Sequence, residues 1–446
     1  MSERLFGTDG VRGRAGEGWL GESQAARLAQ AIGTCLGDGD SPRRALIGHD
    51  GRRSGPGLER AVARGLRAAG IEPLSLGLTT TPGLALMTRR GDFAVGLMIS
   101  ASHNPADDNG IKVFDSTGSK LADEVEDRVE SAVDGIGSVD DDGRDVAQDP
   151  ALEQSYEDHL IAAAGDLDLG GLRIALDCAH GGGSRVAPRV FRRLGAEVIS
   201  IADSPDGSNI NAGCGSTHPE RLMDTVTGKS AHLGIALDGD GDRCLMVDER
   251  GQLVDGDAML TLLGLDLDRR GELSGRRLVA TVMSNKGLHR ALGRAGIGVT
   301  TVGVGDRRVV EALRSEELSL GGEQSGHIIF GGANDYIGDG TLSALRVLGA
   351  LTANGGALSE LAACFQAFPQ VLVNTRVERK PSFDTLPEVV DAVRAIETEL
   401  GDDGRVLLRY SGTEPLARVM VEGPDEARIA ELADSLATLV SEHLGA

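Results

Sequence analysis

The sequence is poor in aromatic residues and in basic charge. Only 3% of its 446 residues are aromatic, which argues against stacking platforms for bases or sugars. Acidic residues outnumber basic residues by 68 to 45, so the formal net charge is −23. The basic footprint of a generic nucleic-acid binder is therefore missing, and we expect no nucleic-acid partner.

Cysteine motifs and long apolar runs are also missing. The five cysteines form no C-x-x-C pair, and their odd number fits reduced thiols rather than a disulfide framework or a zinc ribbon. The longest mostly apolar run, residues 93–101, is far shorter than the ~20 residues of a membrane-spanning helix. The first residues lack the apolar stretch of a secretory signal. We expect a soluble cytoplasmic protein without a membrane partner, and leave open whether it forms a homodimer.

What is present is an ordinary globular composition, with 40% hydrophobic and 25% charged residues. Short apolar runs rich in Val, Ile and Leu alternate with amphipathic helical patterns, which predicts an α/β protein with buried strands. This alternation occurs three times. The last stretch has a β-α-β-β-α order, which predicts a small α+β domain. We expect four domains, over residues 1–150, 151–253, 254–367 and 368–446.

The first chemical motif is Ser100-Ala-Ser-His-Asn-Pro105, which follows a predicted buried strand over 93–100. Pro105 ends both strand and helix, so these residues lie in a loop at the carboxyl end of a strand, where open α/β sheets bind ligands. Ser102 is a candidate nucleophile, and His103 and Lys112 are candidates to position or discharge a phosphoryl group. A serine turn with a solvated histidine is the alternative.

The second motif, Asp238-Gly-Asp-Gly-Asp-Arg243, separates two predicted strands. Carboxylates at every second position of an extended segment point to one side. They repel one another unless a cation lies between them, and an open oxygen site suits Mg²⁺. An EF-hand does not fit, because its sixth position should be Gly and is Arg243. A plain acidic turn is the remaining alternative.

The third motif, Gly321-Gly-Glu-Gln-Ser-Gly-His327, precedes an apolar run. Its glycines allow close backbone approach, and Glu323, Ser325 and His327 can form hydrogen bonds with ligand hydroxyls. A hairpin turn explains the same pattern equally well.

The fourth motif is Arg409-Tyr-Ser-Gly-Thr-Glu-Pro415, and Arg418 follows it on the next predicted strand. Arginine forks, two hydroxyls and free backbone N–H groups around Gly412 form a cradle for a dianion. The alternative is a β-hairpin with an incidental arginine.

Taken together, the four motifs resemble the α-D-phosphohexomutase superfamily over nearly the whole chain. Gln324 and Gly412 resemble its glucosamine branch, whereas Tyr410 departs from the usual phosphate loop. The resemblance extends to Phe6-Gly-Thr-Asp-Gly-Val-Arg-Gly13, Asp50-Gly-Arg-Arg-Ser-Gly55, Asp206-Gly-Ser-Asn-Ile-Asn211, Cys214-Gly-Ser-Thr-His-Pro219, Thr281-Val-Met-Ser-Asn285 and Val304-Gly-Asp-Arg307.

The resemblance implies three similar α/β domains with mixed sheets and a smaller fourth domain around a central cleft. It implies that Ser102 becomes a phosphoserine and is a ligand of one Mg²⁺ beside Asp238, Asp240 and Asp242. Arg12 and Lys112 would be the cationic pair near the transferring group. Glu323 and Ser325 would hold the sugar hydroxyls, and the non-reacting phosphate would be bound by Arg409, Ser411, Gly412, Thr413 and Arg418.

The implied reaction interconverts glucosamine 6-phosphate and glucosamine 1-phosphate, on the route to UDP-N-acetylglucosamine. It is an intramolecular phosphotransfer with glucosamine 1,6-bisphosphate as intermediate and activator. Three rival functions remain at this stage. They are a mutase for mannose or glucose phosphates, a metal-dependent phosphatase that uses Ser102, and a non-enzymatic protein that binds sugar phosphates.

Overall fold

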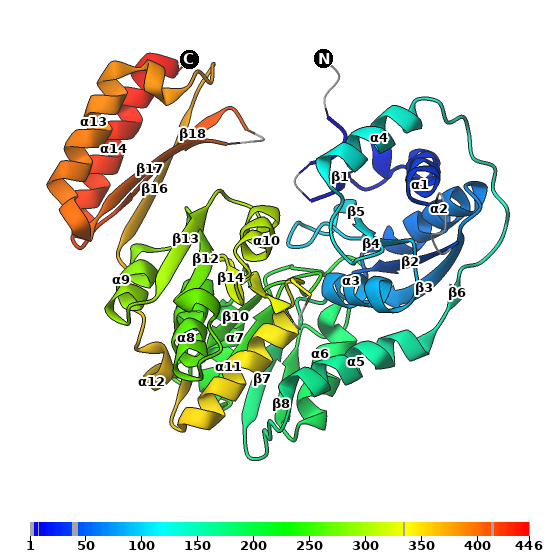
Figure 1. Cartoon of the computed structure of the whole chain (residues 1–446), viewed down its shortest axis with the longest axis horizontal. Coiled ribbons are helices and arrows are strands. Elements are labelled where there is room, and N and C mark those ends of the chain that lie inside the picture. The colour runs from blue at the N-terminus through cyan, green and yellow to red at the C-terminus, as the bar shows by residue number, and fades with distance from the viewer. Residues whose placement is uncertain (1–3, 8, 38–42, 333–334, 412–413, 446) are drawn as a thin grey trace.

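The computed structural model describes residues 4–7, 9–37, 43–332, 335–411 and 414–445. Figure 1 shows four units that follow one another along the chain, from blue at the N-terminus to red at the C-terminus. Each unit is built on its own β-sheet. The predicted class, three α/β units followed by a smaller α+β unit, is confirmed.

The first unit is a mixed sheet with the strand order β1-β5-β4-β2-β3-β6. β2 pairs in parallel with β3 and β4, whereas β5 is antiparallel to β4 and to β1. The strands are Val11–Arg14, Arg44–His49, Glu72–Leu78, Val95–Ile99, Asp108–Asp115 and Ala147–Gln148, β1 to β6 in order. The helices are α1 Glu22–Leu36, α2 Gly55–Ala68, α3 Thr81–Arg90 and α4 Asp123–Val133.

The second unit has the strand order β11-β10-β9-β7-β8, with parallel pairs around β7 and antiparallel pairs around β10. Its strands are β7 Arg173–Asp177, β8 Glu197–Ile201, β9 Leu233–Leu237, β10 Cys244–Val247 and β11 Leu253–Val254. Its helices are α5 Pro150–Ala164, α6 Gly183–Arg193 and α7 Glu220–Gly228.

The third unit has the strand order β13-β12-β14-β15, and only the β14–β15 pair is antiparallel among its described strands. Its strands are β12 Arg277–Thr281, β13 Gly298–Val302, β14 Leu320–Gly322 and β15 Ile328–Phe330. Its helices are α8 Gly256–Arg269, α9 Lys286–Arg294, α10 Asp306–Ser315, α11 Gly340–Asn354 and α12 Leu358–Ala362.

The fourth unit is an antiparallel sheet, β16-β18-β17, with α13 and α14 packed on one face (Figure 1). Because the other face is not covered by a helix, β16 alternates between half-buried and exposed side chains, whereas β4 in the first unit is buried at every position. The elements are β16 Gln370–Arg376, α13 Pro387–Leu400, β17 Arg405–Tyr410, β18 Leu416–Glu422 and α14 Glu426–Leu444.

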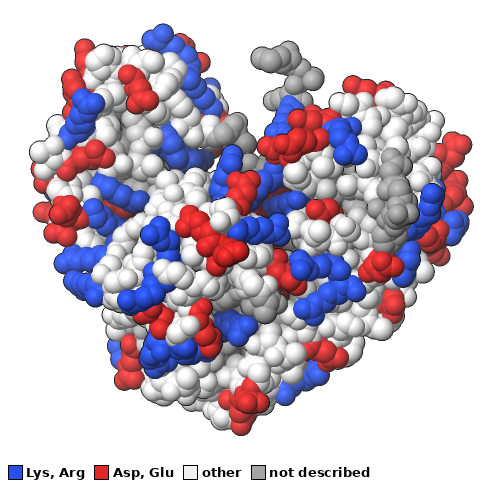
Figure 2. All heavy atoms as spheres, in the orientation of Figure 1, with Lys and Arg blue, Asp and Glu red and all other residues white. Residues whose placement is uncertain are grey.

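The apolar cores divide the molecule differently from the sheets. One buried cluster joins the first three units, with Phe114, Phe191 and Leu348 among its members. The fourth unit has a separate cluster, which includes Val419 and Leu436. Figure 2 shows the result: the fourth unit and the first unit form two lobes with a cleft between them. Within the described ranges, no helix combines the length and apolar character needed to cross a membrane.

The β-α-β-β-α order predicted for the fourth unit is observed, whereas several helices were not predicted. Six helices of the described chain had no predicted counterpart, namely α1, α3, α6, α7, α11 and α12. α3 and α11 are almost wholly buried, so they lack the polar face on which a helical pattern depends. We retain 1–150, 151–253, 254–367 and 368–446 as proposed domains; β11 ends at Val254, one residue beyond the second boundary.

Candidate active site

The serine loop follows β4 and directs Ser102 toward the second unit. Ser102 has a φ of 52°, in the left-handed region that an L-residue seldom adopts, and only 1% of the residue is exposed. Its backbone N–H donates to Ser100 Oγ at 2.8 Å. Its hydroxyl donates to Asp238 Oδ2 at 2.7 Å and lies 3.2 Å from His103 Nδ1. The loop therefore brings the predicted nucleophile into contact with the aspartate motif.

The three aspartates of that motif converge in the turn between β9 and β10. One carboxylate oxygen from each of Asp238, Asp240 and Asp242 lies within 4.8 Å of the others, and all three residues are buried. The prediction of an extended backbone for this motif is wrong. The residues form a tight turn in which Gly241 has a φ of 73°, so the carboxylates converge by turn geometry rather than by strand alternation.

The turn fits a divalent cation. Asp240 Oδ1 is buried and has no hydrogen-bond partner in the described part of the chain, and the nearest cation to Asp242 Oδ1 is the His327 ring at 3.5 Å. Burial, together with the charges of Asp242 and Asp240, raises the pKa of Asp238 well above its usual range. Burial also opposes ionisation of Asp242, but Lys112 and His327 outweigh it and lower the pKa of that carboxyl. Three crowded, buried carboxylates, one of them with an unpaired oxygen, are the donor set of a metal site.

Lys112 partly neutralises this crowd of carboxylates. It lies on β5, almost fully buried, with Nζ 2.7 Å from Asp240, 3.0 Å from Asp9 and 3.5 Å from Asp242. Burial lowers the pKa of Lys112, but Asp240 and Asp9 outweigh burial and hold it well above its usual value. Asp9 also forms an ion pair with Arg12. The predicted pair of cations, Arg12 and Lys112, is thus brought together through one carboxylate.

The two histidines carry different charges. Burial, and then the charges of Arg243 and Arg12, lower the pKa of His103 to about 4, so its ring is neutral at pH 7. Burial opposes protonation of His327, but Asp242 and Asp306 raise its pKa to about 9. The His327 ring lies 3.5 Å from Asp242 and 3.8 Å from Asp306. The structure therefore places His327, the last residue of the third motif, against the aspartate turn.

The loop of the third motif, residues 323–327, connects β14 to β15. Ser325 Oγ is buried without a hydrogen-bond partner among the described residues, and Glu323 Oε1 accepts only a long bond, 3.2 Å, from the N–H of Gly305. Gly326 has a φ of 87°, and a Cβ there would lie 2.1 Å from the carbonyl oxygen of Cys244. This glycine therefore lets the loop pack on β10, the strand that follows the aspartate turn. The polar groups of Glu323 and Ser325 remain available to a ligand.

The fourth motif lies in the fourth unit, at the hairpin between β17 and β18. Arg409 and Arg418 are direct cross-strand neighbours, and burial followed by the charge of Arg418 lowers the pKa of Arg409. Like charges opposite each other destabilise a sheet, and an anion between them removes that penalty. Arg418 donates to Ser411 Oγ at 3.4 Å and to Glu414 at 3.1 Å. The predicted ligands Gly412 and Thr413 lie outside the described residues.

The side chain of Tyr410 packs on the segment between β16 and α13. Its ring stacks on Phe383, with centroids 4.2 Å apart, and its hydroxyl donates to the carbonyl oxygen of Pro381 at 2.7 Å. Lys380 donates to the carbonyl oxygen of Ser411, also at 2.7 Å. Tyr410 and Lys380 thus join the start of the phosphate motif to the segment around residues 380–383.

Family models match the chain in four consecutive segments. Phosphoglucomutase/phosphomannomutase alpha/beta/alpha domains I, II and III match residues 3–140, 154–251 and 255–368, and the C-terminal domain matches residues 372–439. The chain belongs to the phosphoglucomutase/phosphomannomutase family.

Individual relatives agree with this assignment. The phosphoglucosamine mutase of Rhodococcus jostii is 50% identical over 451 residues, which cover 98% of this chain and 99% of the relative. A phosphoglucomutase/phosphomannomutase family protein from Burkholderia thailandensis has a similar crystal structure, with a TM-score of 0.79, 25% identity and 99% and 98% coverage of this chain and that one. N-acetylphosphoglucosamine mutase from Aspergillus fumigatus, in complex with GlcNAc-6P and magnesium, shares the fold at 18% identity, with a TM-score of 0.69 and 98% and 95% coverage.

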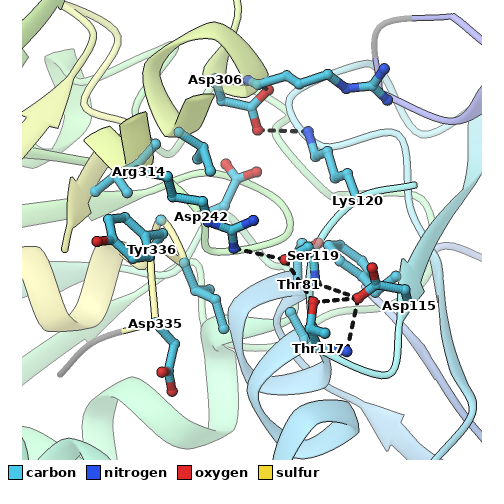
Figure 3. A pocket seen from close by; sticks show the side chains of 18 of the residues that line it. Thr81, Asp115, Thr117, Ser119, Lys120, Asp242, Asp306, Arg314, Asp335 and Tyr336 are labelled. Carbon is cyan, nitrogen blue, oxygen red and sulfur yellow. Dashed lines mark hydrogen bonds and ion pairs between the residues drawn. The ribbon is translucent and has the colours of Figure 1, made fainter. Parts of the chain in front are cut away.

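In this member of the phosphoglucomutase/phosphomannomutase family, a cavity of about 310 Å³ lies between the first and third units and adjoins the aspartate turn. Figure 3 shows Asp242 among its lining residues, with Lys120 reaching Asp306 at 2.6 Å and Arg314 donating to Ser119 at 2.8 Å. These bridges join the first unit to α10. They also extend the charged network from Lys112 to the third unit, because Lys120 forms an ion pair with Asp9 as well.

Some residues of the site had no assigned role at the sequence level. Thr81 donates to Asp240, Lys120 bridges two carboxylates, and Asp9 and Asp306 hold the cations and His327 in place. Thr81 has no chemical motif around it, and its partner lies 159 residues away. Asp9 and Asp306 do lie in segments that carried the family resemblance, and that is the one signal from which they can be found.

Proposed function

We propose that this protein interconverts glucosamine 6-phosphate and glucosamine 1-phosphate through a phosphoserine at Ser102. The observation that carries the proposal is the contact between the Ser102 hydroxyl and the aspartate turn, beside the buried ammonium of Lys112. The choice of amino sugar is supported by the relative at 50% identity named phosphoglucosamine mutase. The Aspergillus fumigatus neighbour with GlcNAc-6P and magnesium supports a hexosamine phosphate and Mg²⁺ as ligands.

In the proposed cycle, the bond between phosphorus and Ser102 Oγ breaks while O1 of glucosamine 6-phosphate bonds to the same phosphorus. The product is glucosamine 1,6-bisphosphate, which turns around in the cleft. Its 6-phosphoryl group then passes to Ser102, which leaves glucosamine 1-phosphate and restores the phosphoserine. The proton that leaves the sugar hydroxyl ends on Ser102 Oγ, and the neutral ring of His103, 3.2 Å from that oxygen, can relay it.

The charged residues serve the transferring group. Asp238, Asp240, Asp242 and Ser102 would hold Mg²⁺, which when bound neutralises charge on the phosphoryl oxygens. Lys112 and Arg12 place two further positive charges at this end of the cleft. At the other end, Arg409 and Arg418 bind the phosphate that is not reacting, while Glu323, Ser325 and His327 orient the sugar.

The relatives favour a mutase over a phosphatase, because relatives of 45–50% identity that cover nearly the whole chain are named phosphoglucosamine mutase. A cytoplasmic location and the absence of a nucleic-acid partner stay predictions, and a homodimer stays a possibility to be tested.

The test is turnover of glucosamine 6-phosphate with Mg²⁺ and a trace of glucosamine 1,6-bisphosphate. We expect kcat/KM at least about tenfold higher than for mannose or glucose phosphates, since a site built for one polar substituent discriminates by that factor or more. A preference for glucose or mannose phosphate would assign the chain to the other branch. Release of inorganic phosphate at the rate of turnover would assign a phosphatase, and absence of any turnover a binding protein.

A further inference from the structure

Arg52, in the loop between β2 and α2, is a fully buried arginine whose N–H groups are all used. Its side chain is 0% exposed, and Nε donates to Asp50 Oδ2 at 2.9 Å. Its other four N–H groups donate to backbone carbonyl oxygens of the serine loop, those of Ser102, Asn104, Pro105 and Asp108. A guanidinium carries five N–H donors in a fixed fork, and here each of the five has an acceptor.

Asn211, from the second unit, holds the same loop from the other side. Its Nδ2 donates to the carbonyl oxygen of Ser102 at 2.9 Å and to that of Asn104 at 3.1 Å. The carbonyl of Ser102 therefore accepts from two side chains that belong to two different units. Gly239 of the aspartate turn packs against this junction, because a Cβ there would lie 2.5 Å from the Ser102 oxygen.

These contacts fall where the backbone most needs support. Ser102 has a left-handed φ, and a non-glycine residue keeps that conformation only where its surroundings fix it. Hydrogen bonds to the Ser102 carbonyl help to hold the backbone from which Oγ projects, and Oγ lies 2.7 Å from Asp238. Misplacing reacting groups by about 1 Å can slow a reaction about a hundredfold.

We propose that Arg52 and Asn211 are positioning residues for phosphoryl transfer, which hold the serine loop of the first unit in register with the aspartate turn of the second. This inference rests on the proposed phosphoserine mechanism. Neither residue contacts Arg409 or Arg418 in the described structure, so their loss should slow the transfer step and leave sugar-phosphate binding intact. Lysine cannot replace Arg52, since an ammonium has three donors and no planar fork.

The experiment compares Arg52→Lys and Asn211→Ala with Arg67→Lys as the matched control. Arg67 is a nearly buried arginine of the same unit, which donates to Asp142 and to the carbonyls of Arg144 and Asp145, away from the serine loop. Melting temperature, kcat, KM and the rate of phosphoserine formation from glucosamine 1,6-bisphosphate are measured for each variant. We expect kcat and phosphorylation to fall about a hundredfold in Arg52→Lys and about tenfold in Asn211→Ala, with KM within about threefold and the control unchanged.

The double variant tests whether the two residues act together. Because both hold the Ser102 carbonyl, its loss in kcat should be smaller than the product of the single losses. A folded Arg52→Lys protein with kcat within twofold of an active wild type would overturn the positioning role alone. If Arg52→Lys does not fold, a folded Asn211→Ala protein with the kcat of the wild type would overturn the positioning role. A wild type that forms no phosphoserine would overturn both this inference and the proposed function.

Discussion

The two ends of the cleft are built in opposite ways. At the serine end, Ser102, Lys112 and the aspartate turn are buried and joined by short contacts between different units. At the phosphate end, the described arginines are only half-buried, and 29% of the Arg418 side chain is exposed. The serine end belongs to units that share one apolar core, whereas the phosphate end belongs to a unit with its own.

The joint between these parts is polar and narrow. Arg405 on β17 donates to the carbonyls of Val282 and Ser284 at 3.0 and 2.6 Å, and Lys286 donates to that of Gly404 at 2.9 Å. These hydrogen bonds are only part-buried, and the apolar cluster of the fourth unit is separate from the cluster shared by the other three, so a shift of the fourth unit costs less than opening a shared apolar core. We conclude that the serine end is preorganised for chemistry and that the phosphate end can adjust its position to the substrate.

The largest effect is expected at the preorganised end, for Ser102→Ala. Removing the phosphoryl carrier should lower kcat at least about a thousandfold while the fold survives, because only one hydroxyl is lost. Intact-protein mass spectrometry should find one phosphoryl group on the wild type and none on the variant. Ser184→Ala, which removes another buried serine hydroxyl, is the control and should remain phosphorylated. A phosphorylated or active Ser102→Ala protein would show that the carrier is another residue.

Asp240→Asn should have the next largest effect. It removes one charge from the aspartate turn and weakens the partner of Lys112. We expect kcat to fall about a hundredfold and the Mg²⁺ concentration for half-maximal activity to rise about tenfold or more. Asp248→Asn changes a buried aspartate of the neighbouring β10–β11 turn and serves as the control. An unchanged Mg²⁺ titration for Asp240→Asn would reduce the aspartate turn to a structural feature.

Arg418→Ala probes the adjustable end, so binding should suffer more than metal activation. An arginine–phosphate hydrogen bond contributes roughly 1.5–3 kcal/mol, and KM should therefore rise about ten- to a hundredfold. Steady-state kinetics at saturating Mg²⁺ measure this effect. Arg428→Ala removes an exposed arginine of the same unit that pairs with Glu399 and is the control. If KM and kcat of Arg418→Ala both stay within about twofold, the phosphate site lies elsewhere.

The smallest effect concerns stability at the joint. Burial raises the pKa of Asp257 to about 7, and its carboxylate accepts from the N–H of Asn285, whose side chain holds the backbone of Phe368 before the fourth unit. The unfolded chain ionises this group near pH 4 and the folded chain near pH 7. The free energy of unfolding should therefore fall as pH rises between these values.

Asp257→Asn removes that pH dependence. Its melting temperature should exceed that of the wild type by about 2–4 °C at pH 8 and match it at pH 4. Thermal melts across this range provide the measurement. Equal pH profiles for the two proteins would mean that the carboxyl is ionised without penalty in the fold.

The comparison also explains what could be predicted from sequence. Ser102, the aspartate turn and Arg409 each lie in a short stretch of unusual residues, and glycine or proline beside them fixes the local backbone. Such local chemistry can be recognised without knowing the fold. The order of strands and helices in the fourth unit followed in the same way from local patterns.

The residues that hold these groups in place could not be predicted from local patterns. Arg52 reaches across 50 residues to the Ser102 carbonyl, and Lys112 across 128 residues to Asp240. Contacts of this kind depend on how the units pack, which no periodicity encodes. The aspartate turn itself was assigned the wrong backbone, because spacing at every second position does not by itself indicate a strand. Asp and Gly are rare in strands and common in turns, and Gly241 has a positive φ here.

If Arg409 and Arg418, which are paired across β17 and β18, bind the phosphate as proposed, the fourth unit is also a small anion receptor before any sugar arrives. Inorganic phosphate or sulfate in the medium can relieve their repulsion, and it will then compete with the phosphate end of the substrate. Because both groups are partly exposed, rising ionic strength will weaken this competition and substrate capture alike. The chemistry at Ser102, shielded from solvent, will be far less sensitive to salt. The apparent KM measured for this enzyme will therefore depend on the buffer, while its limiting rate will not.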